Sequence, residues 1–268
     1  MEGRYQSGSP LWDDFLEGGF EQGCISVLFG PYSSGKTCLA LVALSALPEG
    51  KKAIWIDTEG SFSLDRFKQL CPQYKEILEH TIFFNPVTFE EQESAIMNCE
   101  KICKEEEIEL IVVDSMSMLY RVSSTSTEDA KVLNDSFVRQ LRQLVKLARS
   151  YTLPVLITSQ VYADITTKES VKVVGGLMIK NIGKCLIELR KEEKIRKAEI
   201  VKHRSIEEGH SIEYQIVREG ISLPVVEEDI HSDKNIIEED LKKAGERKDI
   251  LSTRKKEFIP RQKLQEAE

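Results

Sequence analysis

The sequence predicts an α/β fold with a mainly parallel sheet and a C-terminal antiparallel meander. Short apolar runs alternate with longer helical patterns between residues 24 and 158, as in parallel strands joined by right-handed crossovers. Three alternating segments then follow one another between residues 185 and 217, which is typical of a meander. With 268 residues, of which 41% are hydrophobic, the chain can build one large domain around a buried core.

The predicted elements follow from hydrophobic periodicity. Short apolar runs predict buried strands, and apolar residues at helical spacing predict helices. The expected strands are 24–29, 53–56, 81–84, 110–113 and 154–158, then 185–189, 198–204 and 211–217 in the meander. The expected helices are 35–47, 63–70, 89–107 and a long helix that follows Asp129 and ends near Ser150.

Composition divides the chain into a core, residues 1–224, and a charged tail, residues 225–268. The tail holds few large apolar residues, so we expect a flexible, solvated segment with at most one marginal helix. The formal net charge of −8 argues against nucleic-acid binding driven by overall charge, so any such binding must depend on local cations.

The chain has no sequence signal for secretion, membrane insertion or a metal cluster. Its six cysteines include no Cys-x-x-Cys pair, so we expect reduced core thiols. The N-terminus lacks the basic and apolar regions of a signal peptide, and no apolar run approaches the roughly 18 residues of a membrane span. We therefore expect a cytoplasmic protein without membrane contact.

A phosphate-binding loop is the most specific motif. The segment Gly30-Pro31-Tyr32-Ser33-Ser34-Gly35-Lys36-Thr37 fits G-x-x-x-x-G-K-[ST] and lies between a predicted strand and a predicted helix. Backbone N–H groups and the helix N-terminus can surround a β-phosphate, Lys36 can reach the β- and γ-phosphates, and Thr37 can ligate Mg²⁺. The sequence therefore predicts ATP and Mg²⁺ as cofactors, bound by these eight residues together with Cys38.

Polar residues follow three further predicted strands. Because parallel strands end at one edge of a sheet, their side chains are expected beside the phosphate loop. Asp114 is placed to hold Mg²⁺ through water, and Glu59 to orient the attacking water, a role for which Asp57 competes. Gln160 is placed to sense a γ-phosphate.

Several stretches together resemble the archaeal RadB family, a short branch of the RecA-type recombinases. They lie between about residues 8 and 220, and the Asp-Thr-Glu-Gly and Lys-His-Arg-Ser stretches are the more specific ones. They are Gly18-Gly19-Phe20-Glu21-Gln22-Gly23, the phosphate loop, Ile56-Asp57-Thr58-Glu59-Gly60, residues 113–121, residues 154–162, Val174-Gly175-Gly176 and Lys202-His203-Arg204-Ser205.

The resemblance implies a RecA-like ATPase core that acts in homologous recombination and DNA repair. It implies that Glu59 is the catalytic carboxylate, that Gln160 is the γ-phosphate sensor, and that Arg66, seven positions after Glu59, packs on adenine. The helical DNA-binding domain and the Phe-x-x-Ala strand of full-length recombinases are not found, and Asn181 replaces their phosphate-sensing His. We therefore expect weak hydrolysis and an accessory role beside the main archaeal recombinase.

Two predicted loops carry cations that we expect to contact DNA. The resemblance favours single strands, and phosphate contacts need only such cations. The residues are Arg121 before a Ser/Thr run, then Lys168 and Lys172, with Lys180 and Lys184 just beyond.

Lys202 and Arg204 alternate along a predicted strand, so we expect both on one face. Three partners stay open for this pair: the γ-phosphate of a neighbouring subunit in an oligomer, reached as a trans finger; DNA; or the chain's own nucleotide.

Two rival functions also stay open. A KaiC-like signalling ATPase shares the early Gly-Gly motif and the Lys-x-Arg pair, and a nucleotide-gated adaptor binds ATP without turnover.

Overall fold

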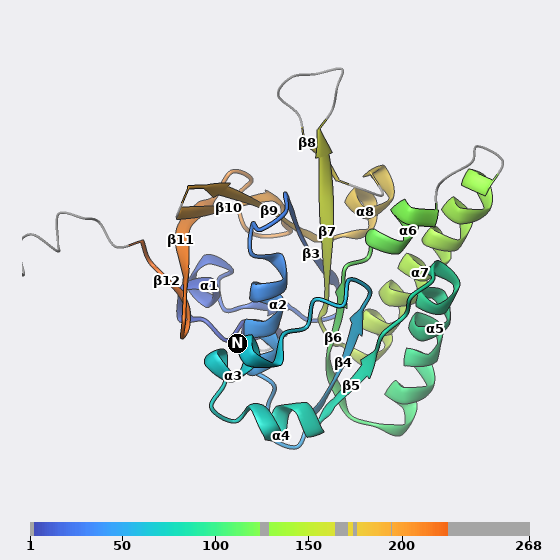
Figure 1. The fold of residues 1–268 in the computed structure, drawn as a ribbon, viewed down its shortest axis with the longest axis horizontal. Coiled ribbons are helices and arrows are strands. Elements are labelled where there is room, and N and C mark those ends of the chain that lie inside the picture. Colours follow the sequence, from blue (N-terminus) through green and yellow to red (C-terminus); the bar gives the residue numbers. More distant parts are fainter. Residues whose placement is uncertain (1–2, 124–128, 164–170, 174–175, 194, 225–268) are drawn as a thin grey trace, which may run out of the picture. The chain divides into compact units, whose positions relative to one another are not determined.

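The computed structural model describes residues 3–123, 129–163, 171–173, 176–193 and 195–224 (Figure 1). Within them, ten strands form one sheet and two form a small separate sheet. The first part of the large sheet consists of β3 (Ile25–Gly30), β4 (Lys52–Asp57), β5 (Thr81–Phe84), β6 (Ile108–Asp114), β7 (Val155–Ala163) and β8 (Val171–Val173). The rest consists of β9 (Cys185–Glu192), β10 (Ile195–Lys202), β11 (Ser211–Val217) and β12 (Gly220–Ser222), while β1 (Arg4–Tyr5) pairs with β2 (Phe20–Glu21).

The register of the parallel strands brings the ends of four strands together. The strand order is β12-β11-β10-β9-β3-β7-β6-β4-β5, with β8 paired to β7. Strands β9, β3, β7, β6, β4 and β5 run parallel, and β10 to β12 run antiparallel. Gly30 pairs with Gln160, and Asp57 pairs with Asp114. All four residues therefore lie at the carboxyl edge of the parallel strands.

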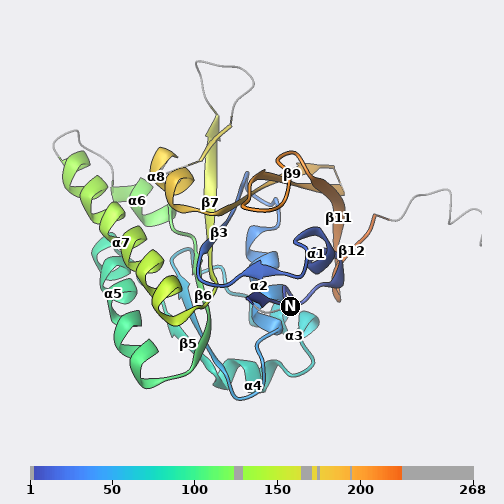
Figure 2. The ribbon, with the colours of Figure 1, turned by 180° about the vertical axis from the view of Figure 1, so that it is seen from behind.

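Helices cover both faces of the sheet (Figures 1 and 2). One face packs against α1 (Pro10–Phe15), α2 (Lys36–Ser45), α3 (Leu64–Leu70) and α4 (Tyr74–Glu79). The other face packs against α5 (Phe89–Glu105), α6 (Met118–Ser123), α7 (Asp129–Tyr151) and α8 (Gly176–Ile182). The central strands are consequently buried on both faces, which explains their continuous apolar runs.

The antiparallel strands support the phosphate loop. A Cβ atom on Gly30 would lie 2.1 Å from the carbonyl oxygen of Leu189 in β9. The buried Tyr214 of β11 donates its hydroxyl hydrogen to the carbonyl oxygen of Ser34 at 3.2 Å. Gly35 has a φ of +103°, and a Cβ there would meet Cδ1 of Ile216 at 3.0 Å. The meander thus leaves no room for a side chain at Gly30, and the positive φ of Gly35 favours glycine there.

The predicted fold class is confirmed: a mainly parallel sheet carries a C-terminal antiparallel meander. The strand expected to reach Arg204 was predicted wrongly, because β10 ends at Lys202. Nδ1 of His203 accepts hydrogen bonds from the backbone N–H groups of Ser205 and Ile206, at 3.2 and 3.1 Å, which turns the chain.

The predicted tail, residues 225–268, lies outside the described residues. No helix in the described part is long and apolar enough to cross a membrane.

Gly30→Ala is expected to lower the free energy of unfolding by about 3 kcal/mol, because the added methyl collides with backbone atoms. Gly50→Ala is the control. Gly50 has a φ of +74°, and a methyl added there would have no atom within 4 Å, so only backbone strain of about 1 kcal/mol is expected. Urea denaturation of both variants measures the difference. Equal losses in the two proteins would contradict the packing of the loop on β9.

Candidate nucleotide site

The phosphate loop joins β3 to α2 through two residues in the left-handed region. Ser33 has a φ of +60°, and Gly35, the N-cap of α2, has a φ of +103°. The first N–H groups of α2 have no acceptor within the helix, so they are free to bind phosphate oxygens. Lys36 and Thr37 are the first two residues of that helix.

Lys36 is directed toward the loop itself. Its Nζ donates to the carbonyl oxygens of Gly30 and Pro31 at 3.0 and 2.8 Å. Burial lowers the pKa of Lys36, and the nearby carboxylates of Glu59 and Asp114 oppose this shift. The ammonium group therefore lies within an anionic site, where two neutral acceptors hold it.

Asp114 is the most buried carboxylate of the site, with 1% of its surface exposed. Ser61 Oγ donates to its Oδ2 at 2.9 Å, and Thr158 Oγ1 donates to its Oδ1. Burial raises the pKa of Asp114, and hydrogen bonds from Thr158, Thr37 and Ser61 act in the opposite direction. The two residues predicted to hold Mg²⁺, Thr37 and Asp114, are thus in contact. Their hydroxyl and carboxylate oxygens are of the kind that Mg²⁺ prefers.

Glu59 lies at the centre of a second set of contacts. Its Oε1 accepts hydrogen bonds from Ser115 Oγ at 2.6 Å and from Gln160 Nε2 at 3.1 Å. The Oε1 atom of Gln160 accepts in turn from Nη1 of Arg121 at 3.1 Å, and the backbone N–H of Gln160 donates to Ser117 Oγ at 3.1 Å. The structure therefore brings the predicted catalytic carboxylate and the predicted γ-phosphate sensor into direct contact.

Asp57, the competing carboxylate, stabilises a turn. Its Oδ1 accepts from the backbone N–H groups of Glu59 and Ser61, at 3.3 and 3.0 Å, and its Oδ2 accepts from that of Phe62 at 3.0 Å. Only 5% of Asp57 is exposed. These contacts leave Glu59 as the better placed of the two to meet a water molecule.

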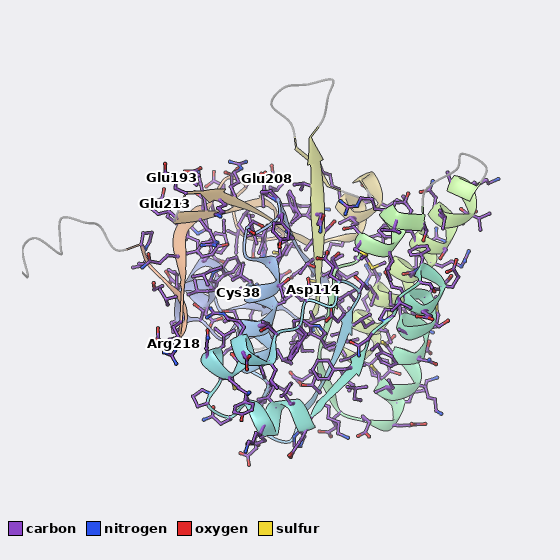
Figure 3. All side chains as sticks on the ribbon, viewed as in Figure 1. Cys38, Asp114, Glu193, Glu208, Glu213 and Arg218 are labelled. Atoms are coloured by element: carbon purple, nitrogen blue, oxygen red, sulfur yellow. The ribbon has the colours of Figure 1, made fainter. Side chains whose placement is uncertain are left out.

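Arg66 joins α3 to α2 and to the turn after β11. Its Nη2 donates to the carbonyl oxygen of Val217 at 2.7 Å and to Sγ of Cys38 at 3.4 Å. Its Nη1 donates to the carbonyl oxygen of Arg218 at 2.9 Å. Figure 3 shows Cys38 on α2, beside the end of β6 where Asp114 lies. Arg66 thus lies beside Cys38, which directly follows the phosphate loop.

The predicted DNA-binding cluster is divided in the structure. Arg121 lies at the carboxyl edge, beside Gln160. Lys184 lies at the opposite end of β3, where its backbone N–H donates to Ile25 at 3.0 Å, so its grouping with Arg121 was wrong. Lys180 is exposed on α8. Lys168 and the side chain of Lys172 lie outside the described residues.

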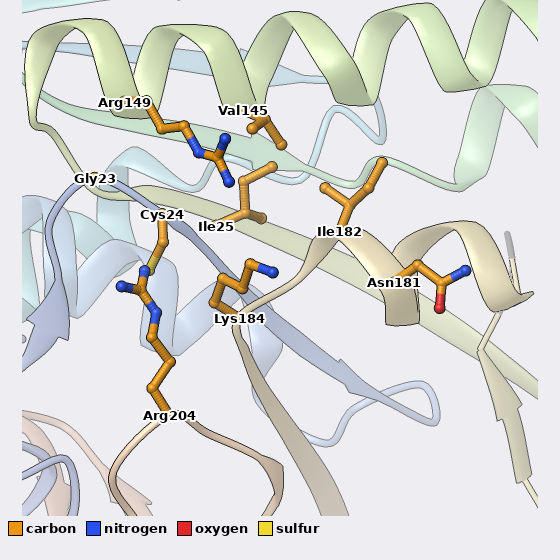
Figure 4. Close-up of a pocket in the computed structure, with 9 residues that line it drawn as sticks. All are labelled: Gly23, Cys24, Ile25, Val145, Arg149, Asn181, Ile182, Lys184 and Arg204. Atoms are coloured by element: carbon orange, nitrogen blue, oxygen red, sulfur yellow. The ribbon is translucent and has the colours of Figure 1, made fainter.

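A separate cavity of about 630 Å³ lies at the amino end of β3 (Figure 4). Its walls carry Arg149 of α7, Asn181 of α8, Lys184 and Arg204. Asn181, expected from the resemblance to stand where full-length recombinases have a phosphate-sensing His, thus lies away from the phosphate loop of its own chain.

Lys202 and Arg204 do not share a face, contrary to the prediction, because the turn at His203 separates them. Nζ of Lys202 donates to the carbonyl oxygens of Lys180 and Gly183 at 2.9 Å each, whereas Nε of Arg204 lies 3.4 Å from Oε2 of Glu21. Arg204 lines the cavity at the amino end of β3, and Lys202 pairs through Leu186 with the level of Val27, three residues before Gly30. Both side chains contact groups outside the phosphate loop of their own chain.

Three hydroxyl residues of the site escaped prediction. Ser115 directly follows Asp114, and Ser61 directly follows Gly60. Thr158 lies two positions before Gln160. The spacing of Thr158 was a usable signal, because residues two apart on a strand share a face. Serines at turns carry no comparable signal.

The comparisons with known proteins agree with this geometry. The Rad51 family model matches residues 4–224. The DNA repair and recombination protein RadB of Methanococcoides burtonii is 40% identical over 218 residues, which cover 80% of this chain and 95% of that one. The protein of the same name from Methanobrevibacter smithii is 35% identical, over 78% and 92% of the two chains.

A solved structure supports the same assignment. The crystal structure of the RadB recombinase superposes with a TM-score of 0.70 at 31% identity, and the match covers 82% of this chain and all of that one. The resemblance to RadB and the RecA-like fold that it implied are thereby confirmed. The chain belongs to the Rad51 family.

Proposed function

We propose that this chain is an ATP-binding, weakly hydrolysing ATPase that acts in homologous recombination and DNA repair, as an accessory to the main recombinase. The observation that carries the proposal is the convergence of Lys36, the Thr37–Asp114 contact and the Glu59–Gln160 contact at one edge of the sheet. Membership of the Rad51 family and the name of the RadB relatives support the cellular role.

Each residue has a defined role in this proposal. Lys36 exchanges the carbonyl oxygens of Gly30 and Pro31 for the β- and γ-phosphates of ATP. Thr37 and Asp114 hold Mg²⁺, which neutralises the charge that develops on the phosphates.

Three further residues complete the site. Glu59 orients the attacking water, Gln160 contacts the γ-phosphate, and Arg66 packs on the base. Slow turnover agrees with the contacts that must first be broken, at Lys36 and between Glu59 and Gln160.

Two of the proposed DNA contacts come from elements at the carboxyl edge of the parallel strands. Arg121 is on α6, just before residues 124–128, and Lys172 is on β8, which pairs with the end of β7. Together with Lys168 and Lys180 they provide local cations on an acidic chain. We propose that they bind the phosphates of a single strand.

Arg204 is the proposed trans finger in an oligomer. Its side chain is 52% exposed and has one carboxylate partner, Glu21, with which a phosphate can compete. Lys202 is held by two carbonyl oxygens, and its proposed role is to position α8 and the segment that carries Arg204.

The Rad51 family match and the RadB relatives favour recombination over the KaiC-like signalling alternative. The nucleotide-gated adaptor is distinguished by turnover. ATP binding without hydrolysis, in the presence or absence of single-stranded DNA, would identify an adaptor.

Lys36→Ala is expected to lower ATP affinity at least tenfold, because the site loses its cation at the β/γ-phosphates.

Glu59→Gln is expected to retain ATP binding and lose hydrolysis, because an amide cannot accept a proton from water. Titration calorimetry and phosphate release, with and without single-stranded DNA, measure both effects. Unchanged affinity in Lys36→Ala, or turnover within about threefold in Glu59→Gln, would refute these roles.

Asp57→Asn and Glu59→Gln are expected to separate turn stabilisation from catalysis. Both oxygens of Asp57 accept from backbone N–H groups. In Asp57→Asn an NH₂ group replaces one of these oxygens and cannot accept, so we expect a loss of about 2 kcal/mol in unfolding free energy. In Glu59→Gln the amide oxygen still accepts from Ser115 and Gln160, so the loss stays below about 1 kcal/mol. Comparable losses in urea denaturation would show that both carboxylates are structural.

Removal of Lys168 and Lys172 together is expected to reduce the salt dependence of DNA binding. Each lost phosphate contact on a single strand lowers the slope of log affinity against log salt by about 0.7, so the double alanine variant should lose about 1.4. The matched control is the double variant of the exposed Lys75 and Lys101, on α4 and α5. Fluorescence anisotropy with a labelled oligonucleotide gives both slopes, and equal slopes would place the DNA site elsewhere.

A further inference from the structure

Arg121 reaches the nucleotide site through the amide of Gln160. Nη1 of Arg121 donates to Oε1 of that amide at 3.1 Å, and Nε2 of the same amide donates to Oε1 of Glu59 at 3.1 Å. An amide has one accepting end and one donating end. If it turned over, its NH₂ group would face the guanidinium and its oxygen would face the carboxylate. Both contacts therefore favour the same orientation of the amide.

That orientation determines what one oxygen of Glu59 can bind. Oε1 of Glu59 accepts from Ser115 Oγ at 2.6 Å as well as from Gln160, so both acceptor positions of this oxygen are used. The backbone N–H of Gln160 is held by Ser117 Oγ at 3.1 Å, which leaves the side chain as the movable part. While its amide donates to Glu59 and accepts from Arg121, Gln160 has only its second NH₂ hydrogen for another acceptor.

Arg121 is well placed to respond to an external anion. It is exposed, it lies in the last turn of α6, and its partner is the neutral oxygen of an amide. A guanidinium binds phosphate through two charge-assisted hydrogen bonds, each roughly twice as strong as a bond between neutral groups. A nucleic-acid phosphate at this position therefore competes effectively for Arg121.

We propose that Arg121 is a positioning residue that restrains hydrolysis in the absence of nucleic acid, by holding the Gln160 amide on Glu59. A phosphate of a bound single strand draws Arg121 away, the amide turns toward the γ-phosphate, and Oε1 of Glu59 becomes available to water. This inference rests on the proposed ATPase function and assigns it a regulatory contact.

The test is steady-state ATP hydrolysis by the full chain, with and without a single-stranded oligonucleotide. Arg121→Ala is expected to raise the rate without DNA about fivefold and to reduce the stimulation by DNA by the same factor. Lys131→Ala removes an exposed cation from the first turn of α7 and is expected to leave the rate without DNA unchanged. If Arg121 only contacted DNA, its removal would weaken DNA binding and leave the rate without DNA as in the wild type.

A second variant shows whether Arg121 acts through Gln160. In a Gln160→Ala background, Arg121→Ala is expected to have no further effect on the rate without DNA, because the group that it positions is absent. Equal effects of Arg121→Ala in both backgrounds would overturn the proposal.

A binding measurement keeps the proposal testable even where turnover is negligible. Arg121→Ala is expected to raise the affinity for ATPγS relative to ADP about fivefold, because the released amide reaches the γ-phosphate. Titration calorimetry of both nucleotides gives this ratio without turnover. An unchanged ratio and an unchanged or lower rate without DNA would overturn the role of Arg121. Failure of the proposed function is distinct, since it would appear as ATP binding that is insensitive to Lys36→Ala.

Discussion

The buried carboxylate of Asp114 is the group on which the arrangement of the site depends. A carboxylate with 1% exposure is costly to keep unless its oxygens are hydrogen-bonded. The donors are Thr37 at the start of α2, Ser61 after β4 and Thr158 on β7. Three separate parts of the chain therefore converge on the end of β6, beside the phosphate loop.

The parallel register explains why much of the site could be predicted from sequence. Once apolar runs identified β3, β4, β6 and β7, their last residues had to meet at one edge, so Asp114 and Gln160 were expected beside the phosphate loop. The choice between Asp57 and Glu59 stayed open on the residues alone, because both lie at the end of the same strand, and only the resemblance favoured Glu59. It depends on backbone N–H groups that only the folded turn directs toward Asp57.

The incorrect predictions concern residues whose position depends on distant contacts. Lys184 follows the helix α8, and the sequence gives no indication that its backbone bonds to Ile25 at the amino end of β3. Arg204 was assigned to a strand because its neighbours alternate, yet the imidazole of His203 ends that strand by accepting two backbone hydrogen bonds. A side chain that bonds to its own backbone can override periodicity, as Asn and Ser do at turns.

The contacts of Lys36 and Glu59 compensate the charges of both groups within the protein. The ammonium of Lys36 would be a costly buried charge without the carbonyl oxygens of Gly30 and Pro31, and Glu59 is likewise satisfied by Ser115 and Gln160. These contacts occupy groups that the reaction needs. Nucleotide binding must replace them, so part of the binding free energy is spent on reorganisation and the net affinity is lower. A chain that binds ATP with this geometry is therefore suited to slow, regulated turnover, in which a second ligand at Arg121 changes the balance between the two sets of contacts.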